Sequence, residues 1–206
     1  MMRLNRRNLM AGAGAFAGLG LAGASALALD IEELNKAPEL GEMALGPADA
    51  KVTVIEYASA TCPHCAAFHK DTFGKLKTEY IDTNKIRFVF REFPLNDAAM
   101  AAFMIARAAP KEAYFPLMDV YFNTLETWAA SPAEGLFNIA RQAGFSKEKF
   151  DATLKDEALA NKIIAIRDGG AKFGVQGTPT FFINGELFDG ERTIEAFRAK
   201  IDPLLQ

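Results

Sequence analysis

The sequence predicts an α/β fold in which a central sheet with flanking helices carries an inserted helical domain. Three observations lead to this prediction. A strand pattern, a helical pattern and a second strand pattern follow one another between residues 51 and 93. Residues 97–173 then show helical patterns, and a hairpin pattern followed by a last helical pattern ends the chain. We therefore assign residues 51–96 and 174–206 to the sheet domain and residues 97–173 to the insertion.

The first 28 residues have the pattern of an export signal. A basic head with the pair Arg6-Arg7 precedes a Gly-, Ala- and Leu-rich run, and the small residues at its end predict cleavage after Ala28 or Ala26. The arginine pair resembles a twin-arginine signal, with the general secretory route as the alternative. A second alternative is that the run stays uncleaved as a membrane anchor, because about 20 apolar residues can span a bilayer.

Charge and cysteine content narrow the classes of partner. The chain has a net charge of −3, and removal of the signal, with three arginines and no acids, leaves −6. A mildly acidic chain without basic blocks gives no reason to expect a nucleic-acid partner. In an exported chain the oxidising compartment favours disulfide chemistry for the two cysteines.

The chain before the insertion reads as a short arm followed by a strand, a helix and a strand. The arm, residues 29–50, is too short for a separate domain, which typically needs at least about 50 residues. Strands are predicted over Lys51–Ala58 and Ile86–Phe93, and a helix over Cys62–Tyr80. Together they form a βαβ unit.

The first strand carries a carboxylate on an apolar face. Val52, Val54 and Ala58 share that face with Glu56, and the opposite face is apolar too. A central strand covered on both sides is therefore predicted, with Glu56 pointing into the core. Because an unpaired buried charge is costly, we expect Glu56 to be partly protonated. Its role is either proton exchange with a nearby thiol or simple pairing with a base such as Lys75 or Lys85.

Two mainly apolar stripes mark helices of the insertion. Their residues recur at helical spacing: Met100, Phe103, Met104 and Arg107 in the first, and Met118, Tyr121, Phe122 and Leu125 in the second. Such stripes are far more often the core of a bundle than a cofactor site. A capping box, Ser131-Pro132-Ala133-Glu134, predicts the start of a further helix.

The last part of the chain predicts a hairpin and a closing helix. Thr180–Ile183 and Glu186–Phe188 read as strands joined by Asn184-Gly185, a pair that favours tight hairpin turns. Gly177-Thr178-Pro179 comes directly before the first of them. A proline there belongs at the start or edge of a strand, and a cis peptide bond would leave backbone groups free for an extended substrate segment.

Cys62-Pro63-His64-Cys65 holds both cysteines of the chain at the start of the predicted helix. The thiolate is the reactive form, and a thiol at a helix N-terminus meets unpaired backbone N–H groups that stabilise it. His64 adds a cationic or hydrogen-bonding neighbour. A stabilised thiolate favours the reduced form, so the disulfide would oxidise other thiols. Cys65, one turn further on, is expected on the buried side as the resolving thiol.

Other interpretations of the cysteine pair remain open to different degrees. A c-type haem site would need histidine where Ala66 stands. A purely structural disulfide would close a loop too short to constrain the unfolded chain much. A copper or zinc site of low coordination number could use the pair with His64 and His69. His69 itself is expected to be a surface residue of the helix.

These motifs together resemble the DsbA family of bacterial thiol:disulfide oxidoreductases, within the thioredoxin superfamily. The resemblance covers about residues 45–205. It rests on Val54-Ile55-Glu56-Tyr57, on the Pro-His dipeptide between the cysteines, on the helical insertion and on Thr178-Pro179 before the hairpin. It implies a thioredoxin fold over the sheet domain.

The resemblance implies a role for each motif residue. Cys62 would be the exposed nucleophile, Cys65 the resolving cysteine, His64 with Pro63 the tuner of the thiolate and Glu56 the buried carboxyl near Cys65. The substrate would bind at a loop of three residues: Gly177, Thr178 and the cis-proline Pro179.

The resemblance also implies a function and partners. The protein would be a monomeric periplasmic enzyme without a cofactor or metal that introduces disulfides into reduced exported polypeptides. A quinone-linked membrane oxidase of the DsbB type would reoxidise it. Before the cis-proline the chain has a threonine, Thr178. In this it resembles the isomerases and reductases of the superfamily more than the best-known oxidases, which have valine at that position. The alternatives are therefore an isomerase or reductase for dedicated partners, or a copper or zinc carrier using the reduced pair.

Overall fold

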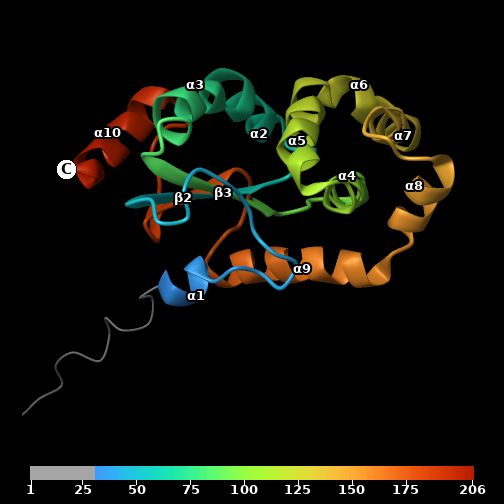
Figure 1. Ribbon diagram of the computed structural model, residues 1–206, viewed down its shortest axis with the longest axis horizontal. Helices are drawn as coiled ribbons and strands as arrows, with labels where there is room; N and C mark the ends of the chain where they lie inside the picture. Colours follow the sequence, from blue (N-terminus) through green and yellow to red (C-terminus); the bar gives the residue numbers. More distant parts are fainter. Residues whose placement is uncertain (1–30) are drawn as a thin grey trace, which may run out of the picture.

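The computed structural model describes residues 31–206, arranged as one sheet with helices on both faces (Figure 1). The predicted export signal and its cleavage site near Ala28 lie outside the described residues. The sheet has five strands in the order β1-β3-β2-β4-β5. Within residues 31–206, no helix combines the length and the apolar character needed to cross a membrane.

The predicted βαβ unit forms the centre of the sheet. Strands β2 (Val52–Ala58) and β3 (Ile86–Glu92) are parallel, and β4 (Thr180–Ile183) pairs with β2 on its other side in the antiparallel sense. A tight turn joins β4 to β5 (Glu186–Phe188), with Asn184 and Gly185 at φ 48° and 84°. Two consecutive left-handed residues suit the twist of a hairpin, so the prediction for Asn184-Gly185 is confirmed.

Strand β2 is covered on both faces, as predicted. Val54 and Ala58 belong to the larger core cluster, which the helical run after β2 and the insertion cover. Ile55 and Tyr57 belong to a smaller cluster on the opposite face. There α9 (Glu157–Lys172) lies along the sheet, beside the short helix α1 (Ile31–Asn35) (Figure 1). Gly170 allows this close approach, since a Cβ atom there would meet the Tyr57 ring at 2.6 Å.

A continuous helical run follows β2, and two of its segments are π-helical. It comprises α2 (Pro63–Phe68), the π segment η1 (His69–Phe73), α3 (Gly74–Leu76) and the π segment η2 (Lys77–Ile81). Four residues that recur at a spacing of four along this run are all buried: Phe68, Thr72, Leu76 and Tyr80. The helix is therefore confirmed, while its wider π turns leave no mark in a spacing of four residues.

Helices fill the sequence between β3 and β4. They are α4 (Asp97–Ala108), the 3-10 turn η3 (Lys111–Ala113), α5 (Tyr114–Asn123), α6 (Leu125–Ala130), α7 (Pro132–Gln142), α8 (Lys147–Leu154) and α9. The helix α10 (Ile194–Leu205) closes the chain. The predicted stripes lie largely in the core, with Phe103, Met104, Met118, Tyr121 and Phe122 buried.

Two details of the chain differ from the predictions. Helix α7 begins at Pro132, as predicted, but Ser131 makes no side-chain capping bond, so the capping box itself is wrong. The same residue ends α6, and its backbone (φ −140°, ψ 77°) serves both helices. The arm contributes more than predicted, because Met43–Leu45 forms the edge strand β1, antiparallel to β3.

Candidate active site at the start of α2

The two cysteines lie at the first turn of α2, directly after the loop that leaves β2. Cys62 is the extended residue that caps the helix, and Pro63 occupies its first position, where no N–H is needed. Cys65 is completely buried, as expected. Both side chains are free thiols.

The expectation that Cys62 is exposed is wrong. The residue is only 4% exposed because the loop before β4 covers it. Its Sγ donates a hydrogen bond of 3.2 Å to the Thr178 carbonyl oxygen, across 116 residues of sequence. The neighbouring Pro63 and His64 are exposed and form the rim of the site.

The loop of Gly177, Thr178 and Pro179 lies beside Cys62. The peptide bond between Thr178 and Pro179 is cis. Thr180 Oγ1 donates to the Gly177 carbonyl oxygen at 2.7 Å, which ties the loop to the start of β4. Thr178 Oγ1 is buried and, while Cys62 keeps its proton, has no hydrogen-bond partner in the described part of the chain. The structure thus brings together all three loop residues that the sequence singled out.

The surroundings of Cys62 stabilise its thiolate. A hydrogen bond from the Cys65 side chain is the largest cause that lowers the pKa of Cys62, to about 5. The Thr178 side chain and the backbone N–H groups of Cys65 and His64 act in the same direction, while burial opposes them. These donors are the unpaired groups of a helix N-terminus, joined by the hydroxyl of the loop.

Cys65 is shifted in the opposite direction. Burial is the largest cause that raises the pKa of Cys65 well above its ordinary value, and Cys62 and the Glu56 carboxylate add to it. One thiol of the pair is therefore ionised at neutral pH while the other holds its proton. Cys62 is therefore the nucleophilic sulfur of the reduced pair, and Cys65 is the less reactive, protonated thiol.

Glu56 is fully buried on β2, as predicted, and its partner is His69. Glu56 Oε2 lies 2.9 Å from His69 Nε2, and the His69 side chain is only 4% exposed. The prediction that His69 is a surface residue is wrong, because α5 of the insertion covers that face of the helix with Phe122. Neither Lys75 nor Lys85 is the base that pairs with Glu56.

The burial of His69 could have been predicted from its spacing in the sequence. Counting from Cys65 in steps of three and four residues reaches Phe68, His69, Thr72 and Leu76, which share one face of the helix. Phe68, Thr72 and Leu76 on that face are all buried. Position therefore predicts burial for His69, whereas the polarity of its side chain suggested solvent.

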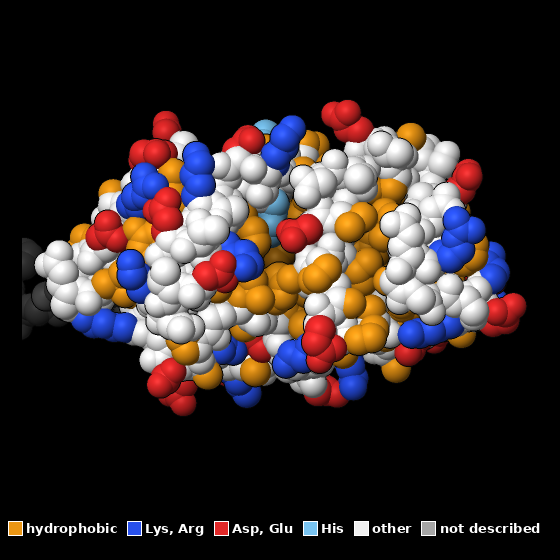
Figure 2. All heavy atoms as spheres, turned by 45° about the horizontal axis from the view of Figure 1, so that its top comes forward, with side chains coloured by type: hydrophobic (Ala, Val, Ile, Leu, Met, Phe, Trp, Pro, Cys, Tyr) orange, Lys and Arg blue, Asp and Glu red, His pale blue; other side chains and the backbone are white. Residues whose placement is uncertain are grey.

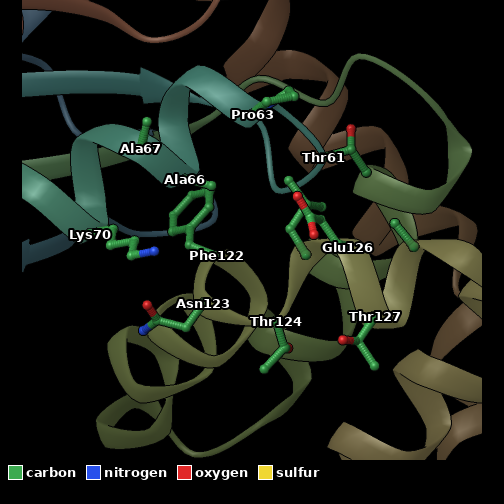
Figure 3. Close-up of a pocket in the computed structure, with 12 residues that line it drawn as sticks. Thr61, Pro63, Ala66, Ala67, Lys70, Phe122, Asn123, Thr124, Glu126 and Thr127 are labelled. Carbon is green, nitrogen blue, oxygen red and sulfur yellow. The ribbon is translucent and has the colours of Figure 1, made fainter.

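A hollow of about 490 Å³ opens beside Pro63, between the active-site helix and the insertion (Figure 3). Thr61, Ala66 and Lys70 line one wall, and Asn123 and Glu126 of the α5–α6 region line the other. Hydrophobic side chains gather on this side of the molecule between the sheet domain and the insertion (Figure 2). Within residues 31–206, no group of three or more His, Cys, Asp or Glu side chains is placed to hold a metal ion.

Titration of the reduced protein will show one thiolate forming with a midpoint near pH 5. The absorbance of the thiolate in the ultraviolet, followed against pH, measures this midpoint. Because the pKa of Cys62 is lower in the folded than in the unfolded protein, the thiolate stabilises the folded reduced protein above the unfolded pKa, and this contribution is lost as pH falls through about 5. Thr178→Val removes one donor and should raise the midpoint by about one pH unit. A midpoint near the ordinary cysteine value in the unsubstituted protein would contradict this description.

Comparisons with known proteins agree with this geometry. A family model described as Thioredoxin matches residues 39–203. A Rickettsia bellii protein named "Putative protein-disulfide oxidoreductase" is 35% identical over 171 residues, which cover 80% of this chain and 65% of that protein. The chain thus spans slightly less than two thirds of the length of this relative.

Solved structures show the same similarity. The crystal structure of Wolbachia pipientis alpha-DsbA1 matches with a TM-score of 0.77 and 30% identity, over 85% of this chain and 95% of that one. The crystal structure of a protein-disulfide isomerase from Novosphingobium aromaticivorans matches with a TM-score of 0.71 and 25% identity, over 83% of this chain and 100% of that one. With its sheet, its insertion and its paired cysteines, the chain belongs to the DsbA family of thiol:disulfide oxidoreductases, within the thioredoxin superfamily.

Proposed function

We propose that the protein is a periplasmic oxidase that introduces disulfides into reduced exported polypeptides through Cys62 and Cys65. The observation that carries this proposal is the opposite environment of the two thiols. Cys62 is stabilised as a thiolate and Cys65 is kept protonated, so the reduced protein is favoured over its disulfide. A disulfide that is easily reduced is an oxidant for other thiols.

Oxidation of a substrate takes two exchange steps. A substrate thiolate attacks Cys62 Sγ, a mixed disulfide forms, and the bond between Cys62 and Cys65 breaks with its electron pair on Cys65 Sγ, which takes up a proton. A second substrate thiolate then attacks the substrate sulfur of the mixed disulfide, and Cys62 leaves as a thiolate. The substrate loses two electrons and the protein disulfide gains them. The low pKa of Cys62 makes it a good leaving group in the second step.

The loop before β4 is the proposed substrate-binding element. The Thr178 carbonyl oxygen, next to the cis-proline, accepts a hydrogen bond from Cys62 Sγ, so this loop borders the sulfur that a substrate thiolate would attack. An extended substrate segment can add to such an edge through main-chain hydrogen bonds, which suits polypeptides of unrelated sequence. In this proposal the N-terminal signal exports the chain, and a membrane oxidase of the DsbB type reoxidises the Cys62 and Cys65 pair.

The second candidate is a disulfide isomerase or a reductase for dedicated partners. Thr178 before the cis-proline favours it, and one of the similar solved structures is named a protein-disulfide isomerase. The Thr178 side chain acts the other way, because its hydroxyl lowers the pKa of Cys62 and so favours an oxidising disulfide.

Two refolding assays separate the candidates. In the first, the mature protein in its disulfide form is mixed with a reduced exported protein without other oxidants, and we expect stoichiometric formation of substrate disulfides. In the second, the reduced protein is mixed with a scrambled substrate without added oxidant. Reactivation only in the second assay would replace the oxidase by the isomerase.

A further inference from the structure

A buried carboxyl–imidazole pair lies near the resolving thiol, since His69 follows Cys65 by four residues on the same helical run. Glu56 comes from the central strand β2 and His69 from the first π turn after α2, and their side chains are at most 4% exposed. Glu56 Oε2 and His69 Nε2 are 2.9 Å apart, a normal hydrogen-bond distance. The pair is therefore a fixed part of the core rather than a surface ion pair.

Aromatic rings enclose the imidazole. Phe122 of α5 stacks on it with ring centroids 4.3 Å apart and planes at 26°, and Phe73 lies 4.6 Å away on the same helical run. Phe90 of β3 contributes a third ring at 6.1 Å. Such a cage holds the ring in place and keeps water away from it.

Each member of the pair keeps one atom without a hydrogen bond. Glu56 Oε1 and His69 Nδ1 are buried and have no partner among residues 31–206. Buried polar atoms normally have partners, so two open positions on one pair call for an explanation. For Glu56 Oε1, the open position is explained if this oxygen gives and takes a proton during the reaction.

The pair is coupled electrostatically to the resolving thiol. The Glu56 carboxylate is among the causes that raise the pKa of Cys65. Tyr114 and Asp119, both on α5, also interact electrostatically with the pair. The strand neighbours of Glu56 in the sheet are Phe90 and Phe181, which carry no charge.

We infer that His69 is a positioning residue for proton transfer to Cys65: it donates Nε2–H to Glu56 Oε2, so that Oε1 carries the exchangeable proton. This inference rests on the proposed exchange at Cys62 and Cys65. When the disulfide opens, Cys65 Sγ takes the electron pair and the proton of Glu56. The carboxylate left behind keeps the hydrogen bond from His69, and a proton from solvent later restores it. His69 stays neutral throughout.

The test uses single-turnover reduction of the protein disulfide by a small dithiol peptide, measured across the pH range. His69→Leu removes the donor, and His69→Gln keeps an N–H in the place of Nε2 but cannot titrate. We expect H69L to slow the opening about 10-fold to 100-fold at neutral pH and to raise the midpoint of its pH profile by one to two units. H69Q should restore both to near the unsubstituted values.

A double-mutant cycle shows whether His69 acts through Glu56. In a Glu56→Gln background H69L should cause no further loss of rate. Tyr121→Phe is the matched control, because it removes from the neighbouring helix a buried hydroxyl that has no partner among residues 31–206, and it should leave the profile unchanged. If H69L does not fold, His69→Phe, which keeps a ring stacked on Phe122, takes its place.

The outcomes are distinct. Failure of the unsubstituted protein to exchange disulfides overturns the proposed function. Exchange in the unsubstituted protein, with H69Q as slow as H69L, overturns the positioning role because the imidazole itself must then titrate. Unchanged profiles in both variants, or a full effect of H69L in the E56Q background, also overturn it.

Discussion

Replacing Cys62 by serine will abolish disulfide exchange, lowering the rate by at least about 10³-fold. Serine cannot form a disulfide, and its hydroxyl is not ionised by the donors that stabilise the Cys62 thiolate. Oxidation of a reduced substrate measures the loss. The variant should remain folded, because the hydrogen bond of Cys62 to the Thr178 carbonyl can be made by a hydroxyl. Residual exchange above about 1% would contradict the assignment of Cys62 as the nucleophile.

Cys65→Ala provides the matched control for Cys62→Ser. It keeps the nucleophile and removes the resolving thiol, so mixed disulfides should accumulate instead of being released. Trapped partners from cells identify the substrates and the direction of electron flow. If mixed disulfides accumulated in Cys62→Ser rather than in Cys65→Ala, the roles of the two sulfurs would have to be exchanged.

Replacing Arg107 by methionine will lower the free energy of unfolding by about 3 to 5 kcal/mol. Arg107 and Glu92 form a buried ion pair with side chains 2% and 0% exposed, and Arg107 Nη2 donates to Glu92 Oε2 at 2.9 Å. Tyr114 donates its hydroxyl to the same carboxylate at 2.7 Å. Without the guanidinium, the Glu92 charge stays buried with only a neutral donor. Denaturant unfolding followed by circular dichroism measures the change.

Arg198→Met is the control for this experiment. Arg198 pairs with Glu79 at 2.6 Å on the surface, where solvent screens the interaction, and its loss should change stability little. Equal effects of the two substitutions would contradict the view that burial gives the Arg107 pair its importance.

Local patterns predicted most of the fold. Alternation in Val52–Ala58 identified a strand covered on both faces, and the two core clusters on its two sides agree. The pair Asn184-Gly185 identified the hairpin because its conformational preference is local. Cys62 and the Thr178-Pro179 loop were both singled out, although only the fold brings them into contact.

Features that depend on distant parts of the chain were not predicted. Strand β1 has three residues, too few for a periodic signal, and pairing with β3 holds it in place. Helical spacing indicates that His69 is buried, but the ring that covers it, Phe122 of α5, lies more than 50 positions later in the chain. Glu92 and Arg107 come from β3 and α4, and neither local pattern shows that they meet.

The redox equilibrium with glutathione tests the central claim that this disulfide is an oxidant. The mature protein is equilibrated over a range of reduced and oxidised glutathione, and the fraction of reduced Cys62 and Cys65 is measured after acid quenching. We predict a potential more positive than about −180 mV, the value typical of protein disulfide isomerase. A potential near −270 mV, about that of thioredoxin, would contradict the claim and make the protein a reductase.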